Sequence, residues 1–247
     1  MPSKENPAGD MAVRISVAST VVGSLSVLCR LYIRLFMIRS PGMEDLCITI
    51  AMLLSTAFTV LIKVQADAGM GMHVWDLTQE ELLRPLRALF ASILCYYLAF
   101  AFIKASFLFQ FYRIFPRTRM RRIIYITGTF ITLFSIETVI MTIFMCVPVQ
   151  KFWKPSLAGF CFDKKPLWFS QSILHIVTDV IIFLLPVSEL KHLNMPKRQK
   201  RALIFVFALG FLGCATSIVR LHSLIQISNG TDMTYDNAKT ATWSAGN

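Results

Sequence analysis

Residues 46–62 read LCITIAMLLSTAFTVLI, a run of seventeen residues that contains no charged side chain. A helix rises 1.5 Å per residue, so about 20 mostly apolar residues cross the roughly 30 Å hydrocarbon core of a bilayer. With its flanking residues, the run predicts a membrane-crossing helix over 46–64. Taken alone, it is equally compatible with a buried helix of a large soluble protein.

Five further segments of the same kind decide between these alternatives. The predicted helices span residues 11–38, 46–64, 85–112, 123–146, 167–190 and 202–222. In a chain of 247 residues, 55% hydrophobic and 16% charged, six apolar helices leave too little polar surface to cover them in water. The sequence therefore predicts an all-α fold, a multi-pass bundle of six transmembrane helices.

Short polar segments flank the predicted bundle of residues 11–222. Residues 1–10 form a polar N-terminal segment and residues 223–247 a polar C-terminal tail. Because residues 1–10 are polar and lead directly into a long apolar segment, the first helix is expected to be retained and not cleaved as a leader.

The chain is strongly basic, with a formal net charge of +11. No basic segment accompanies a foldable soluble module, so no nucleic-acid partner is expected. Cytoplasmic loops of membrane proteins collect Lys and Arg instead. The loops after the first, third and fifth helices hold 13 basic residues and the opposite side holds nine. This difference predicts that the N-terminus lies outside.

Two features of the predicted outer side agree with this orientation. Indole rings suit the membrane interface, and all four tryptophans fall on that side or at its boundary: Trp75, Trp153, Trp168 and Trp243. Asn229 begins an N-glycosylation sequon in the predicted outer tail, which makes it a candidate glycosylation site. Such triplets also occur by chance, so an unmodified Asn229 is the alternative.

Two of the six cysteines flank a polar outer loop. Cys146 and Cys161 begin and end the stretch CVPVQKFWKPSLAGFC. An oxidising compartment favours a disulfide between them, and two free thiols are the alternative. The other four cysteines lie in apolar runs and are expected to be small buried hydrophobes. No Cys or His spacing typical of metal binding occurs, so neither a metal nor a cofactor is expected.

Ionisable residues inside the predicted helices are candidates for function, because such groups cost free energy in hydrocarbon and normally face the bundle interior. His175 and Asp179 are four residues apart and therefore share a helix face. Glu137 lies near the middle of the fourth helix, at a similar depth. We expect a polar cluster of Glu137, His175 and Asp179 that lines a pocket for a small molecule. The alternative is that each side chain only bonds a neighbouring helix.

Lys104 lies in the inner third of the third predicted helix. The simpler expectation is that its ammonium group snorkels toward the cytoplasmic surface. The alternative is a partnership with Asp179, in which case Lys104 joins the same pocket.

The second predicted outer loop reads ADAGMGMHVWDLTQEE and offers two further ligand candidates, His73 and Trp75. An ordinary turn before a short helix is the simpler interpretation of this loop. No sequence motif of a known hydrolase, kinase, nucleotide-binding protein or zinc protease occurs, so no catalytic residue is assigned.

A series of short stretches in a fixed order covers nearly the whole chain. The first are Arg30-Leu31-Tyr32-Ile33-Arg34, Glu44-Asp45, Gly69-Met70-Gly71-Met72-His73, Lys104-Ala105-Ser106-Phe107-Leu108 and Tyr112-Arg113-Ile114-Phe115-Pro116. The series continues with Cys146, Pro148, Trp153, Gly159, Cys161, Thr178-Asp179, Pro186, Met195-Pro196, Lys200, Gly210 and Arg220. In this series the chain resembles the fungal rhodopsin-domain integral membrane proteins, which include receptor-like members and a satratoxin-cluster member.

The resemblance implies a seven-helix, receptor-like fold with the N-terminus outside. The family pattern continues beyond residues 243–247, so six of its seven helices are expected here and the seventh is missing. The expected location is the plasma membrane or the endoplasmic reticulum.

The leading hypothesis is a receptor-like or accessory protein associated with a secondary-metabolite pathway. Its partners would be the bilayer, an unidentified small molecule, and a cytoplasmic protein or anionic lipid that contacts the basic loops 113–122 and 191–201. A cyclase-like membrane enzyme that uses a carboxyl group as general acid is the second hypothesis, and a small-molecule transporter is the third.

Overall fold

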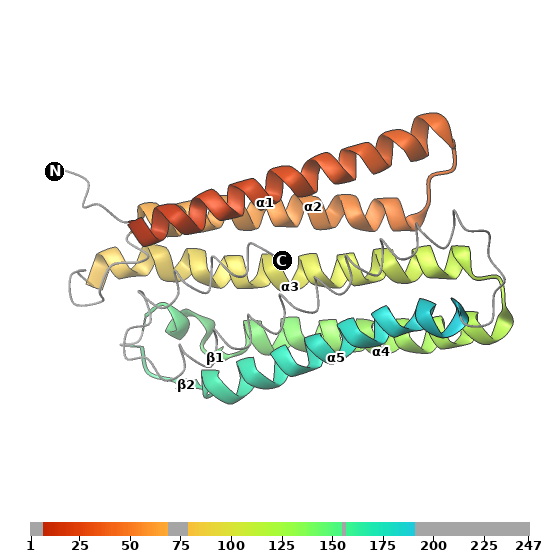
Figure 1. Cartoon of the computed structure of the whole chain (residues 1–247). Coiled ribbons are helices and arrows are strands. Elements are labelled where there is room, and N and C mark those ends of the chain that lie inside the picture. The colour runs from red at the N-terminus through yellow and green to blue at the C-terminus, as the bar shows by residue number, and fades with distance from the viewer. Residues whose placement is uncertain (1–6, 69–78, 155–156, 191–247) are drawn as a thin grey trace.

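Five long helices run alternately in opposite directions in the computed structural model, which describes residues 7–68, 79–154 and 157–190 (Figure 1). They are α1 (Pro7–Tyr32), α2 (Met43–Asp67), α3 (Gln79–Ile114), α4 (Thr118–Ile143) and α5 (Lys164–Leu190). Each is long and apolar enough to cross a membrane by length and composition. The predicted all-α, multi-pass bundle is therefore confirmed for five spans. The sixth predicted span, 202–222, and the tail over 223–247 lie outside the described residues.

The surface of the bundle is apolar, as a membrane protein requires. Large side chains such as Val22, Leu53 and Leu133 have more than 60% of their surface exposed on three different helices. Soluble monomers rarely expose such continuous apolar area. Hydrocarbon, and not water, is the solvent in which this surface is stable.

The start of α2 shows why the helices extend beyond the apolar runs. Asp45 accepts a hydrogen bond from the backbone N–H of Gly42 at 3.2 Å, which satisfies a free donor at the helix N-terminus. The carboxylates of Glu44 and Asp45 also lie in the first turn, where the helix dipole favours negative charge. The helix therefore begins at Met43, three residues before the expected start at Leu46.

Similar local causes set the other helix ends. After Tyr32, α1 continues as a π-helical turn, η1 (Ile33–Met37), before the chain reverses toward α2. Pro116 interrupts the backbone hydrogen bonding between α3 and α4. At the other end, α4 stops at Ile143 and the expected helical residue Cys146 instead belongs to strand β1.

The connection from α4 to α5 folds back on itself and is closed by a disulfide. Strand β1 (Cys146–Val147) pairs antiparallel with β2 (Phe160–Cys161), and the 3₁₀ turn η3 (Val149–Phe152) lies between them. Cys146 and Cys161 are joined through their sulfurs, as the sequence predicted. Gly159 has a φ of 155°, and a Cβ atom there would collide with the carbonyl oxygen of Val147.

This connection packs against the N-terminal part of α3. Phe90 contacts Phe152 and Trp153, with ring centroids 5.3 and 5.7 Å apart, and the guanidinium of Arg87 lies 5.8 Å from the Trp153 ring centroid. We call this end of the bundle the disulfide end. The opposite end, where α1 turns into α2 and α3 into α4, is called the ion-pair end for the contacts described below (Figure 1).

Helix α3 lies between α2 on one side and α4 and α5 on the other (Figure 1). The largest buried apolar cluster fills the ion-pair half of the space among α3, α4 and α5: Leu108, Phe111, Phe115, Met120, Ile124, Ile131, Ile182 and Leu185. Polar side chains replace this cluster nearer the middle of the helices.

Candidate functional site

Lys104 lies at the centre of a buried polar site between α3 and α5. Its ammonium Nζ contacts three side chains of α5: Asp179 Oδ1 at 3.0 Å, Thr178 Oγ1 at 2.6 Å and His175 Nδ1 at 3.2 Å. Only 3% of the Lys104 surface is exposed. We call these four residues the lysine centre.

The spacing of the three α5 residues explains how one ammonium group reaches them all. Positions three and four residues apart lie on the same helix face, so His175, Thr178 and Asp179 present their polar atoms to α3 together. The Thr178 hydroxyl donates to the backbone carbonyl of His175 at 2.8 Å, which leaves its oxygen lone pairs to accept from Lys104. The Lys104 ammonium also lies 3.3 Å from the backbone carbonyl of His175, so it contacts both the ring and the main chain of that residue.

Aromatic rings from two helices surround His175. Tyr97 of α3 stacks on the imidazole, with centroids 5.5 Å apart and planes at 13°. Phe134 of α4 meets it edge to face at 5.2 Å, and Phe100 of α3 at 6.0 Å. Apolar rings lower the local dielectric and so strengthen the ion pair between Lys104 and Asp179.

The lysine centre agrees with the sequence prediction in part. His175 and Asp179 come together on one face of α5, and Lys104 pairs with Asp179 instead of snorkelling to the surface. Snorkelling does not occur because three polar groups of α5 replace the water that the ammonium would otherwise seek. Glu137 differs from its expected place, because its side chain is exposed on α4 and the buried face carries Phe134 and Thr138.

The other predicted site residues fall outside the described part of the chain. His73 and Trp75 of the α2–α3 connection, and the sequon at Asn229, belong to ranges that the structure does not describe. The same holds for the basic loop 191–201. For metal binding, the described residues contain no group of three or more His, Cys, Asp or Glu side chains that could hold an ion.

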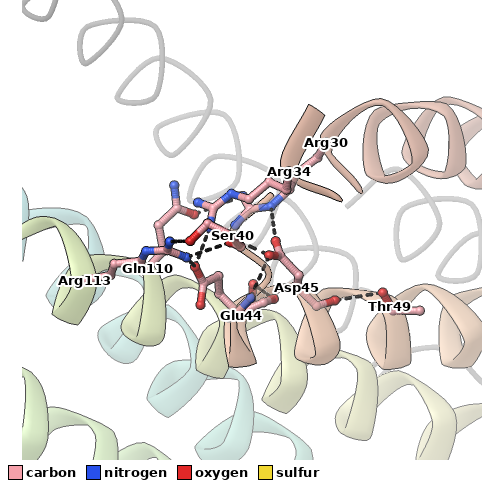
Figure 2. A network of polar contacts seen from close by, with 10 residues as sticks. Arg30, Arg34, Ser40, Glu44, Asp45, Thr49, Gln110 and Arg113 are labelled. Atoms are coloured by element: carbon pink, nitrogen blue, oxygen red, sulfur yellow. Dashed lines mark hydrogen bonds and ion pairs between the residues drawn. The ribbon is translucent and has the colours of Figure 1, made fainter. Parts of the chain in front are cut away.

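A second polar cluster, at the ion-pair end, was not predicted as a site (Figure 2). Two buried carboxylates of α2 meet three arginines, one each from α1, η1 and α3. Arg30 Nε lies 3.3 Å from Asp45 Oδ1, Arg113 Nη1 lies 2.8 Å from Glu44 Oε1, and Arg34 contacts both carboxylates. The Glu44 and Asp45 side chains are only 5% and 6% exposed. We call these five residues the arginine cluster.

Neutral groups complete the arginine cluster and tie three helices together. Arg30 donates to Gln110 Oε1 of α3 at 3.0 Å, and Arg113 donates to the backbone carbonyl of Ser40 at 3.2 Å. Ser106 of α3 donates to the backbone carbonyl of Glu44 at 2.7 Å. The sequence signal was available: arginines end the first apolar segment and two acids open the second, so opposite charges meet at one end of adjacent helices.

Comparison with known proteins places this geometry in a family. The fungal rhodopsin domain matches residues 29–246. The chain is 23% identical over 94% of its length to the Fugralins biosynthesis cluster protein 2 of Gibberella zeae, and 24% identical over 63% of its length to the Receptor GIN3 of Arthrobotrys oligospora. It is 28% identical over 51% of its length to the Satratoxin biosynthesis SC1 cluster protein 4 of Stachybotrys chartarum.

The matched part is shorter than these relatives. It covers 60% of the Gibberella protein, 38% of the Arthrobotrys protein and 48% of the Stachybotrys protein. No solved structure matches the chain. Since the domain match includes both the lysine centre and the arginine cluster, the chain belongs to the fungal rhodopsin domain family of membrane proteins.

Proposed function

We propose that this protein binds a small, largely apolar molecule between its helices and serves a secondary-metabolite pathway as a receptor-like or accessory protein. The observation that carries the proposal is the lysine centre, in which Lys104 pairs with Asp179 and contacts His175, whose imidazole lies against aromatic rings of α3 and α4. Relatives that are named as biosynthesis-cluster proteins, and one that is named as a receptor, support the pathway and the role.

A buried charge at this depth needs a reason, because an ionised side chain costs about 3 kcal/mol or more in the middle of a bilayer. Replacing an ion pair with apolar residues of similar size is often neutral or stabilising. Stability alone therefore does not favour the Lys104–Asp179 pair. A role in binding a ligand, or in switching between two helix arrangements, would explain why the pair is present.

The geometry favours binding over catalysis by a general acid. Oδ1 of Asp179 lies 3.0 Å from the ammonium of Lys104, so the carboxyl group that a cyclase would use as general acid already contacts a partner. Glu137, the other candidate acid, is exposed on α4 and faces away from the lysine centre.

The proposed orientation puts the disulfide end outside and the ion-pair end in the cytoplasm, in the plasma membrane or the endoplasmic reticulum. The arginine-rich loop 113–122 lies at the ion-pair end and carries five of the 25 basic residues. Its charge suits an acidic cytoplasmic protein surface or anionic lipid.

The test is deletion of the gene, metabolite profiling, and complementation with variants. Asp179→Asn is expected to reach the membrane at normal levels and fail to restore the metabolite profile. Glu137→Gln is the matched control, an intramembrane carboxyl outside the lysine centre, and is expected to restore it fully. The double variant Lys104→Met with Asp179→Leu removes both charges and covers the case in which Asp179→Asn fails to fold.

Two outcomes would contradict the proposal. Full complementation by both Asp179→Asn and the double variant would remove the lysine centre from function. Loss of complementation in Glu137→Gln, with accumulation of an unconverted pathway intermediate, would favour the enzyme.

A further inference from the structure

Two polar side chains, Thr138 of α4 and Gln171 of α5, are buried about one helical turn from the lysine centre. The rings of Phe134 and His175 contact each other at 5.2 Å, which fixes the relative height of the two antiparallel helices. Thr138 follows Phe134 by four residues and Gln171 precedes His175 by four. Both therefore lie about 6 Å nearer the disulfide end, on the faces that carry Phe134 and His175.

Both side chains are buried, and they have no hydrogen-bond partner among the described residues. Gln171 is 3% exposed and neither atom of its amide group is bonded, while Thr138 is 1% exposed and its hydroxyl is not bonded. Buried polar groups are nearly always bonded in proteins, most of all in hydrocarbon, where no water can serve. The two groups together offer three hydrogen-bond donors and two acceptor atoms that the described protein does not use.

The conformation of Thr138 is unusual for its own helix. Four other hydroxyls of α4, those of Thr129, Thr132, Ser135 and Thr142, each donate to the backbone carbonyl four residues earlier. This local bond is the default for a hydroxyl in a membrane helix. Thr138 forgoes it, so its buried hydroxyl has no partner among the described residues.

The backbone of α5 approaches α3 and α4 less closely than those two helices approach each other. The buried apolar cluster of α3, α4 and α5 fills the ion-pair half of this space, whereas Thr138 and Gln171 lie on the other side of the lysine centre.

We propose that Thr138 and Gln171 form the head-group subsite of the small-molecule pocket, and that the head group is a neutral carboxamide or protonated carboxylic acid. This inference rests on the proposed function and names the chemical class of its ligand. A primary amide such as that of Gln171 pairs with a carboxamide or a carboxylic acid through two parallel hydrogen bonds, because each partner presents one donor and one acceptor side by side. The Thr138 hydroxyl supplies a third bond.

Charge decides between the neutral and the ionised forms. The ammonium of Lys104, in the lysine centre, already faces the carboxylate of Asp179 at 3.0 Å. An ionised carboxylate beside Gln171 would find no counter-charge among the described residues at that level, and it would bear the full cost of desolvation. A neutral head group avoids that cost and leaves the apolar body of the ligand against the ring of Phe134.

The first test needs no ligand. Purified protein in lipid nanodiscs is unfolded by heat and followed by tryptophan fluorescence. Thr138→Val and Gln171→Leu remove unused buried polar groups, so each is expected to raise Tm by about 2–4 °C. Thr142→Val is the matched control: it is buried one turn further along the same face of α4, its hydroxyl is bonded, and its replacement is expected to leave Tm unchanged or lower it. Lower Tm in both Thr138→Val and Gln171→Leu would show that these side chains are bonded and would overturn the subsite.

The second test uses straight-chain carboxamides of six to twelve carbons as probes, with the matching N,N-dimethylamides, which lack the donor. A ligand that binds only the folded state raises Tm. The carboxamides are expected to raise Tm of the wild type and of Thr142→Val, and to raise it by less than a third as much in Gln171→Leu. Equal shifts from carboxamides and dimethylamides, equal shifts in Gln171→Leu, or no shift with any chain length would each overturn the proposal.

The two proposals fail separately. The double variant Lys104→Met with Asp179→Leu bears on the role of the lysine centre in the cell, whereas the carboxamide shift in purified protein bears only on the head-group subsite. A carboxamide shift in wild type together with full complementation by the double variant would keep the subsite and remove the proposed function.

Discussion

At the scale of single residues, position along a helix could be predicted from the sequence better than rotation about the helix axis. Counting along the apolar runs placed His175 and Asp179 near the middle of their helix, where they lie in α5, whereas Glu137 lies nearer the end of α4 than expected. The direction in which a side chain points depends on the rotation of its helix, because successive residues are turned by about 100° around the axis. Helix α4 is apolar on nearly all sides, so its sequence does not mark a buried face. Glu137 was therefore assigned to the interior, while its neighbour Thr138 is the residue that lies there.

The spacing within α5 was more informative. His175 and Asp179 are four residues apart, which fixes their common face whatever the rotation of the helix. Lys104 could not be assigned in the same way, because its partners lie on another helix more than 70 residues away in sequence.

The lysine centre leads to a prediction about stability. Lys104→Met leaves Asp179, whose side chain is 19% exposed, without the cation that faces it, and is expected to cost about 3 kcal/mol. Adding Asp179→Leu to this variant is expected to recover most of the loss, because the second buried charge is then gone. Thermal unfolding in nanodiscs measures both. A double variant that is less stable than Lys104→Met would contradict the assignment of the ion pair.

At the scale of elements, hydropathy predicted which segments are helices, and local polar chemistry set where they end. The apolar runs identified five of the described helices. Their ends differ by a few residues from expectation because carboxylates cap α2 and because the disulfide-closed strands take Cys146 out of α4. Caps and turns are short-range features that an average over twenty residues does not resolve.

The arginine cluster leads to an element-scale prediction of unequal costs. Glu44 is 5% exposed and contacts both Arg34 and Arg113, so Glu44→Gln leaves the three guanidinium groups of the cluster with Asp45 as their single carboxylate and is expected to cost about 3 kcal/mol. Arg113 is 41% exposed and can be hydrated, so Arg113→Gln is expected to cost about 1 kcal/mol or less. Thermal unfolding of the two variants at equal salt compares them, and a larger loss in Arg113→Gln would contradict the geometry.

At the scale of the whole molecule, the sequence predicted the class of fold and left the arrangement of helices open. Long uncharged runs in a short chain require lipid, whatever their order in space. Which helices touch depends on side chains such as Ser106 and Gln110, whose partners on α1 and α2 are visible only in the folded chain. The position of α3 between its neighbours could therefore not be predicted from the sequence.

Orientation is the prediction that belongs to this scale. A flexible insertion with an Asn-Ser-Thr acceptor after Leu157, in the connection closed by the disulfide, is expected to be glycosylated in cells. The same insertion after Arg117, in the basic loop at the ion-pair end, is expected to remain unmodified. A mobility shift removed by endoglycosidase measures both, and the reverse result would place the N-terminus in the cytoplasm.

The pairing of Lys104 with Asp179 also determines how a movement of these helices would respond to the membrane potential. One elementary charge that moves through the whole bilayer gains or loses about 2.3 kcal/mol per 100 mV of membrane potential. The two side chains carry opposite charges at one depth, so a rearrangement that carries them together transports no net charge through the field. A helix movement of this kind, together with a neutral ligand, would proceed equally well in a polarised and a depolarised membrane.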